Sequence, residues 1–122
     1  MLSVSPGTRI YLTTEPVDLR RGHDGLTALV RTQFRMDPLE GHLFVFVGRR
    51  VDRVKILFWD RGGFVLYYKR LAQGRFRMPK VDSGADRIVL DGTELAMLLG
   101  GFDLTGARRT AAWQPRGRQH VA

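Results

Sequence analysis

The sequence contains no cysteine, which excludes disulfide bonds, thiolate nucleophiles and cysteine-ligated zinc sites. It also lacks any run of about 20 apolar residues, the length that a membrane-spanning helix requires. Residues 1–7 have neither the cationic segment nor the long apolar stretch of a secretory signal. From these absences we expect a cytoplasmic protein with no membrane partner.

Metal-ligand and phosphate-loop patterns are missing as well. The three histidines, His23, His42 and His120, share no metal-ligand spacing and sit in unlike contexts. The glycines mark turns and form neither a Walker-type phosphate loop nor a dinucleotide-binding fingerprint. The sequence therefore predicts no metal and no cofactor.

Four aspartates are of the type that could hold Mg²⁺ for phosphoryl transfer, but each also has a structural role. Asp24 and Asp91 are placed to begin helices, Asp60 lies in a turn, and Asp18 can pair with a neighbouring arginine, Arg20 or Arg21. No two of them have a spacing that fixes both carboxylates on one element. We therefore expect no enzymatic activity.

Lysine is scarce, with 3 residues against 17 arginines, and the formal net charge is +8. Residues 49–80 hold ten Lys/Arg and two acids, a net of +8, whereas residues 1–48 sum to zero, 81–105 to −4 and 106–122 to +4. Arginine offers a planar fork to phosphate and a flat face that stacks on bases. The charge pattern favours a polyanionic partner. The alternative is that high-GC coding enriches arginine in a basic protein that binds none.

A chain of 122 residues has the length of one domain. We expect a single α+β domain over 1–105 and a basic, mobile tail over 106–122, where apolar periodicity ends. Runs typical of strands cover 9–12, 43–47, 51–59, 64–71 and 87–90. Helical spacing predicts amphipathic helices over 24–35 and 91–100, the second opening with a capping box of Asp91 and Glu94. The expected fold is a mainly antiparallel sheet with these two helices mainly on one face.

Arg61 and Gly62 predict a two-residue turn between the third and fourth strands. Such a turn places Trp59 opposite Phe64, Leu57 opposite Leu66, Lys55 opposite Tyr68 and Arg53 opposite Arg70. The other face then carries Val54, Ile56, Phe58, Val65 and Tyr67, and we expect the first helix to cover that apolar face. A slip of one residue would mix the two faces.

Cations and aromatic residues alternate through this central segment. Phosphates are contacted by lysine and arginine, and bases stack on aromatic side chains exposed among them. The candidate nucleic-acid-binding residues are Arg49, Arg50, Arg53, Lys55, Trp59, Tyr68, Lys69, Arg70, Arg75 and Arg77. For the aromatic members, packing in the core is the competing interpretation.

Between about residue 2 and residue 109 the chain resembles the TnpB accessory protein of IS66-type bacterial insertion sequences. The motifs that carry the resemblance lie at 6–12, 17–26, 41–46, 55–60 with 63–64, and 67–71 with 74–76. This is the small second-frame product of the element, not the longer RNA-guided nuclease that is also called TnpB. In such elements a separate, larger protein carries the transposase chemistry, so the resemblance implies an accessory role without catalysis.

Together these features lead to one hypothesis and one alternative. The hypothesis is a non-catalytic accessory protein of transposition that binds DNA through its basic sheet segment. The alternative is a protein-interaction subunit that docks on the transposase, or on another protein of the element, without direct DNA binding. A small nuclease would need clustered carboxylates, which the sequence does not show.

Overall fold

The computed structural model describes residues 5–81 and 84–100. Its elements are β1 (Ile10–Thr13), α1 (His23–Thr32), the short 3-10 helix η1 (Pro38–Glu40), β2 (Leu43–Val47), β3 (Arg53–Asp60), β4 (Gly63–Arg70), β5 (Arg87–Leu90) and α2 (Gly92–Gly100). The tail expected over 106–122, and its boundary with the domain, lie outside the described residues. Within the described ranges no helix is long and apolar enough to cross a membrane.

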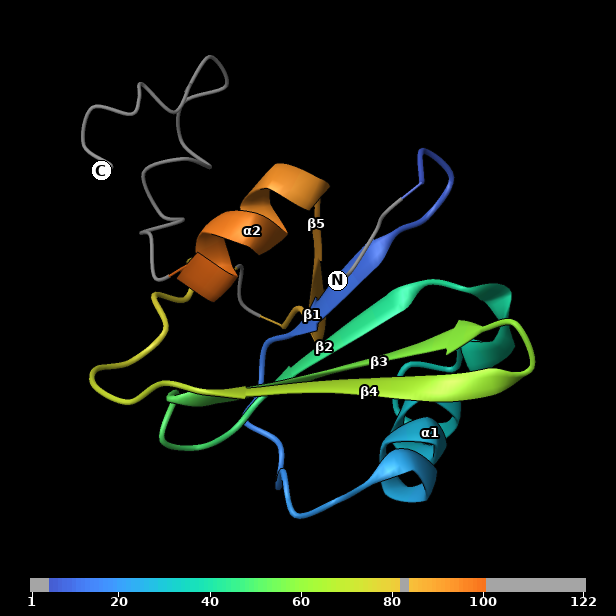
Figure 1. Cartoon of the computed structure of the whole chain (residues 1–122), viewed down its shortest axis with the longest axis horizontal. Helices are drawn as coiled ribbons and strands as arrows, with labels where there is room; N and C mark the ends of the chain where they lie inside the picture. The colour runs from blue at the N-terminus through green and yellow to red at the C-terminus, as the bar shows by residue number, and fades with distance from the viewer. Residues whose placement is uncertain (1–4, 82–83, 101–122) are drawn as a thin grey trace.

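The strands form one sheet of five in the order β4-β3-β2-β1-β5 (Figure 1). β1 and β2 are parallel and are joined through α1, whereas each of the other neighbouring pairs is antiparallel. The α+β class and the mainly antiparallel sheet are thus confirmed. The parallel pair was not expected from the sequence, because it joins segments more than 30 residues apart.

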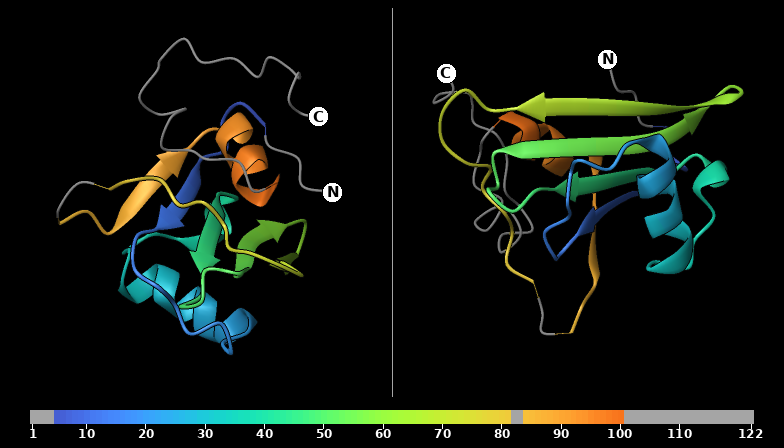
Figure 2. Two further views of the ribbon diagram at one scale, coloured as in Figure 1. Left: turned by 90° about the vertical axis from the view of Figure 1, so that its left-hand side faces the viewer. Right: turned by 90° about the horizontal axis from the view of Figure 1, so that it is seen from below.

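The two helices lie on opposite faces of the sheet, as Figures 1 and 2 show. On one face α1 packs Leu26 and Val30 into a cluster with Phe44, Phe46 and Leu57. The prediction that both helices lie mainly on one face was therefore wrong. So was the prediction that the first helix covers the face of Val54 and Ile56.

The opposite face is covered by α2, which packs Leu95 and Leu98 into a cluster with Val45, Val54 and Ile56. The strand sequences explain why the sheet has a helix on each face. Successive strand residues point to opposite faces, yet Ile56 and its neighbour Leu57 are both fully buried. A sheet with two apolar faces needs a helix on each.

The hairpin between β3 and β4 has the predicted register. All four expected pairs are present, from Trp59 with Phe64 at the turn to Arg53 with Arg70 at the far end. Arg61 and Gly62 have positive φ angles of 45° and 89°, the combination that a type I′ turn requires. The predicted capping box at the start of α2 is confirmed too: Glu94 N–H donates to Asp91 Oδ1 (2.7 Å) and Asp91 N–H donates to Glu94 Oε1 (3.0 Å).

Candidate nucleic-acid interface

Arginines from three segments gather at the end of the sheet where β3 begins and β4 ends. Leu71 N–H donates to the carbonyl of Asp52 (2.8 Å), and Phe76 N–H donates to the carbonyl of Val51 (2.7 Å). These two bonds hold the segment after β4 beside the turn between β2 and β3. The basic end of the sheet, as we call it, consists of Arg49, Arg50, Arg53, Arg70, Arg75 and Arg77, of which all but the half-buried Arg53 are exposed.

A hollow of about 390 Å³ opens beside this end. The segment before α1 forms one wall, the turn between β2 and β3 forms another, and the exposed ring of Tyr68 on β4 borders it. Its lining residues are Val17, Asp18, Leu19, Arg20, Gly48, Arg49, Arg50, Asp52, Arg53 and Tyr68. We call it the basic hollow, since four arginines line it against two aspartates.

Both aspartates of the hollow already face an arginine. Arg20 donates through Nε and Nη2 to the carboxylate of Asp18, at 2.9 and 2.6 Å. These hydrogen bonds, with one from the Arg20 backbone, hold the pKa of Asp18 well below its usual range. Asp52 Oδ1 lies 3.7 Å from Arg53 Nε, an ion pair too long for a hydrogen bond.

The remaining two arginines of the hollow, Arg49 and Arg50, carry its excess positive charge. In the part of the chain that the structure describes, neither has a carboxylate within ion-pair distance. Both are exposed and sit on a tight turn. Among the described residues, these two guanidinium groups are thus left without competition from carboxylates.

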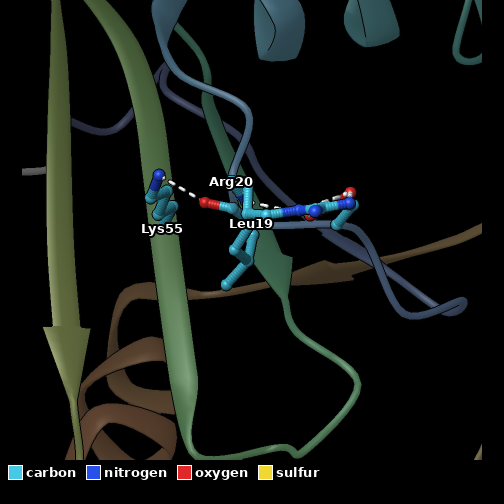
Figure 3. Close-up of polar contacts among 4 residues, drawn as sticks. Leu19, Arg20 and Lys55 are labelled. Atoms are coloured by element: carbon cyan, nitrogen blue, oxygen red, sulfur yellow. Dashed lines mark hydrogen bonds and ion pairs between the residues drawn. The ribbon is translucent and has the colours of Figure 1, made fainter.

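Lys55, a predicted phosphate contact, is held by the protein itself. Its Nζ donates to the carbonyl oxygens of Leu19 (2.6 Å; Figure 3) and Arg21 (2.9 Å), and it lies 5.2 Å from the centroid of the Tyr68 ring. These contacts tie the segment before α1 to the sheet. The geometry makes Lys55 a support for the wall of the basic hollow.

Two other predicted residues are set apart from the basic end, one by the face of the sheet on which it lies and the other by its position along β3. Lys69 is on the face of α2, where its Nζ donates to the carbonyl of Leu99 (2.8 Å). Trp59 is near the opposite end of β3 and packs edge-on against Phe64, with ring centroids 5.0 Å apart. The structure thus brings seven of the ten candidates together, namely Arg49, Arg50, Arg53, Tyr68, Arg70, Arg75 and Arg77. Lys55 differs from them by its contacts within the protein, and Trp59 and Lys69 differ by their location.

Arg20 is a lining residue that sequence reasoning assigned only to pairing with Asp18. Its loop reaches the hollow because Val17 N–H donates to the carbonyl of Val47 (2.9 Å) and Leu19 packs against Gly48. A Cβ atom at position 48 would lie 3.2 Å from Leu19 Cδ1, so glycine permits this close approach. The apolar Val17 and Leu19, which alternate with the charged Asp18 and Arg20, were the available signal that this loop packs on the sheet.

Two other polar residues considered from the sequence, His42 and Asp24, occupy structural positions. His42 accepts a hydrogen bond at Nδ1 from Arg9 N–H (3.0 Å), and Asp24 lies in the first turn of α1. Among residues 5–81 and 84–100, no three histidine or acidic side chains cluster in a way that could hold a metal ion. His120 lies outside these ranges.

Comparison with known proteins identifies the family. Residues 8–109 match the family model described as IS66 Orf2 like protein. The chain is 39% identical over 115 residues to a protein of Sinorhizobium fredii named uncharacterized protein y4jC, covering 94% of this chain and 97% of that one. It is 35% identical to uncharacterized protein y4hO of the same organism, covering 94% and 96%. No solved structure matches significantly. The resemblance read from the sequence is confirmed: the chain belongs to the IS66 Orf2-like family of insertion-sequence accessory proteins.

Proposed function

We propose that this protein assists transposition without catalysis, by binding nucleic acid at the basic end of the sheet. The observation that carries the proposal is the pair Arg49 and Arg50, which line the basic hollow with no acidic partner in the described part of the chain. Arg70, Arg75 and Arg77 extend the same charged surface, exposed along the end of β4 and the segment after it. The family membership supports the role in insertion-sequence transposition.

Phosphate groups supply most of the binding in this account. Lysine and arginine contacts to the backbone release counterions, so affinity falls as salt rises, by a slope of roughly 0.9 per contact for duplex and 0.7 for a single strand. Tyr68, a residue that is 51% exposed, adds an aromatic ring at the border of the hollow. A base freed from its stack can lie on such a ring, which contributes roughly 1–3 kcal/mol.

The test is direct binding of the purified protein to DNA with no other protein present. Labelled duplex and single-stranded oligonucleotides of one sequence are titrated by fluorescence anisotropy at several salt concentrations. We expect saturable binding that weakens steeply with salt. If neither DNA binds at low salt, while the transposase of the element captures the protein, the docking alternative replaces this proposal.

Tyr68→Ala separates phosphate contacts from stacking. It removes the ring without changing charge, so the salt slope should stay the same while single-strand affinity falls more than duplex affinity. An equal loss for both forms of DNA would argue against stacking at this residue.

A further inference from the structure

Within the described residues the outer edge of β4 is open, because β4 ends the sheet and has β3 as its only strand neighbour there (Figure 2, right). In an antiparallel ladder every second residue of a strand hydrogen-bonds to the neighbouring strand. The bond from Leu71 N–H to the Asp52 carbonyl shows which residues of β4 bond to β3 and which do not. Every second residue of β4 therefore points its N–H and C=O away from the sheet: Phe64, Leu66, Tyr68 and Arg70.

Among residues 5–81 and 84–100 this edge has little of the usual protection against pairing, because its charged residues, Lys69 and Arg70, stand only at one end of the strand. Exposed edges are otherwise blunted by proline, bulges, shortness or charges spread along the strand. β4 has eight residues, no proline and an unbroken register with β3. Two of its apolar or aromatic side chains, Val65 and Tyr68, are exposed. The opposite edge strand, β5, has only four residues. β4 is thus the edge in the described chain best built to receive another strand.

We propose that β4 pairs antiparallel with β4 of a second copy of this chain, centred on Tyr67. In this register Phe64 lies opposite the second copy's Arg70, and Leu66 lies opposite the second copy's Tyr68. All four outward-facing residues of each β4 then find a hydrogen-bonding partner, and each such pair exchanges two bonds. Sliding the second strand by two residues in either direction keeps the hydrogen-bonding phase. It places one of the four outward-facing residues of each β4 opposite a residue outside the strand.

The charges of β4 favour this occupant. Its cations, Lys69 and Arg70, stand together at one end of the strand. Antiparallel pairing sets the two cationic ends at opposite ends of the interface, with Lys69 opposite the second copy's Val65. No two like charges face each other, which would be destabilising in a cross-strand pair. Arg70 instead meets the aromatic ring of Phe64, a favourable cation–π partner.

The pairing gives a continuous sheet whose two-fold axis is perpendicular to it. Both α1 faces then lie on one side, and so do both basic hollows. The two Arg70 residues are separated by six strand positions, roughly 20 Å at 3.4 Å per residue. The proposal does not rest on nucleic-acid binding, because it follows from the edge of β4 alone.

The absence of cysteine from the sequence permits a clean test. In the proposed register the two copies of residue 67 face each other in a non-hydrogen-bonded pair, with Cα atoms about 4.5 Å apart. Tyr67→Cys should therefore form an intermolecular disulfide under mild oxidation, seen on a non-reducing gel. The matched control is Val65→Cys, on the same face, because its two copies lie four positions apart, beyond the roughly 7 Å that a disulfide can span.

A second pair of variants tests the interface without oxidation. Tyr68→Pro removes an outward N–H that β3 does not use, whereas Tyr68→Val loses the same ring and keeps the N–H. Sedimentation equilibrium should show a dimer for the wild type and Tyr68→Val and a monomer for Tyr68→Pro, with circular dichroism confirming that each is folded. A monomeric wild type, or equal cross-linking through positions 65 and 67, would overturn the proposed pairing. Loss of DNA binding alone would leave it standing.

Discussion

Arg53 and Arg70 lie directly opposite each other on β3 and β4, at the end of the hairpin furthest from its turn. Two like charges in a cross-strand pair are destabilising. Asp52 offsets part of the repulsion, since its carboxylate lies 3.7 Å from Arg53. Arg70 has no such partner in the described part of the chain. A phosphate-binding role would account for two arginines that face each other in a positive surface at a cost in stability.

Replacing Arg70 should therefore separate stability from binding. Arg70→Thr removes the repulsion and places a β-branched residue on the strand, so the free energy of unfolding should rise by about 0.5 kcal/mol. The affinity for DNA should fall at the same time, because one phosphate contact is lost. Urea unfolding and anisotropy titrations measure the two effects. A variant that is less stable, or that binds DNA as tightly as before, contradicts this account of the pair.

Lys55 should behave as a structural residue. Lys55→Met leaves the carbonyls of Leu19 and Arg21 without their donor, and the free energy of unfolding should fall by about 1 kcal/mol. The control is Lys80→Met, which removes the same charge from an exposed side chain. It should change stability little.

Hydrogen exchange locates the effect of Lys55→Met. Amides of residues 17–22 should exchange faster, because the segment before α1 has lost its tie to β3. The slope of DNA affinity against salt should be unchanged, since Lys55 is not counted among the phosphate contacts. A slope lowered by as much as that of an Arg49 variant would return Lys55 to the binding surface.

Asp18→Asn should strengthen DNA binding. Arg20 holds the Asp18 pKa well below its usual range, so this carboxylate stays charged at neutral pH and occupies the Arg20 guanidinium. The amide oxygen of asparagine can still accept from Arg20 N–H and preserve the local turn, while the ion pair is lost. Arg20 is then free for phosphate, and the salt slope should steepen by up to about 0.9. Weaker binding by this variant would mean that Asp18 acts in some other way.

Local features of the fold were predictable from the sequence. The register of the β3–β4 hairpin follows from a two-residue turn at Arg61 and Gly62, and the start of α2 follows from Asp91 and Glu94. Each depends on residues close together in the chain. The basic end of the sheet was predictable for the same reason, because the hairpin brings Arg53 and Arg70 together.

What could not be predicted depends on contacts between distant residues. Lys55 was expected to contact phosphate, but its partners in the structure are backbone carbonyls 34 and 36 residues away, which no local pattern reveals. The side of the sheet that each helix covers was misjudged because Ile56 and Leu57 are equally apolar. Alternation in β3 therefore could not show which face α1 takes.

Under the proposed function, DNA binding is local to the basic end of the sheet and is not a product of net charge. This locality is tested most directly by the salt dependence of DNA affinity for two variants with equal charge loss. One replaces Arg49, Arg50 and Arg70 with glutamine; the other replaces Arg9, Arg31 and Arg35, which are exposed and do not line the basic hollow. We predict that the first lowers the slope by about 0.9 per lost duplex contact, and the second leaves it nearly unchanged. Equal losses from the two variants would instead show that the protein binds DNA by net charge alone.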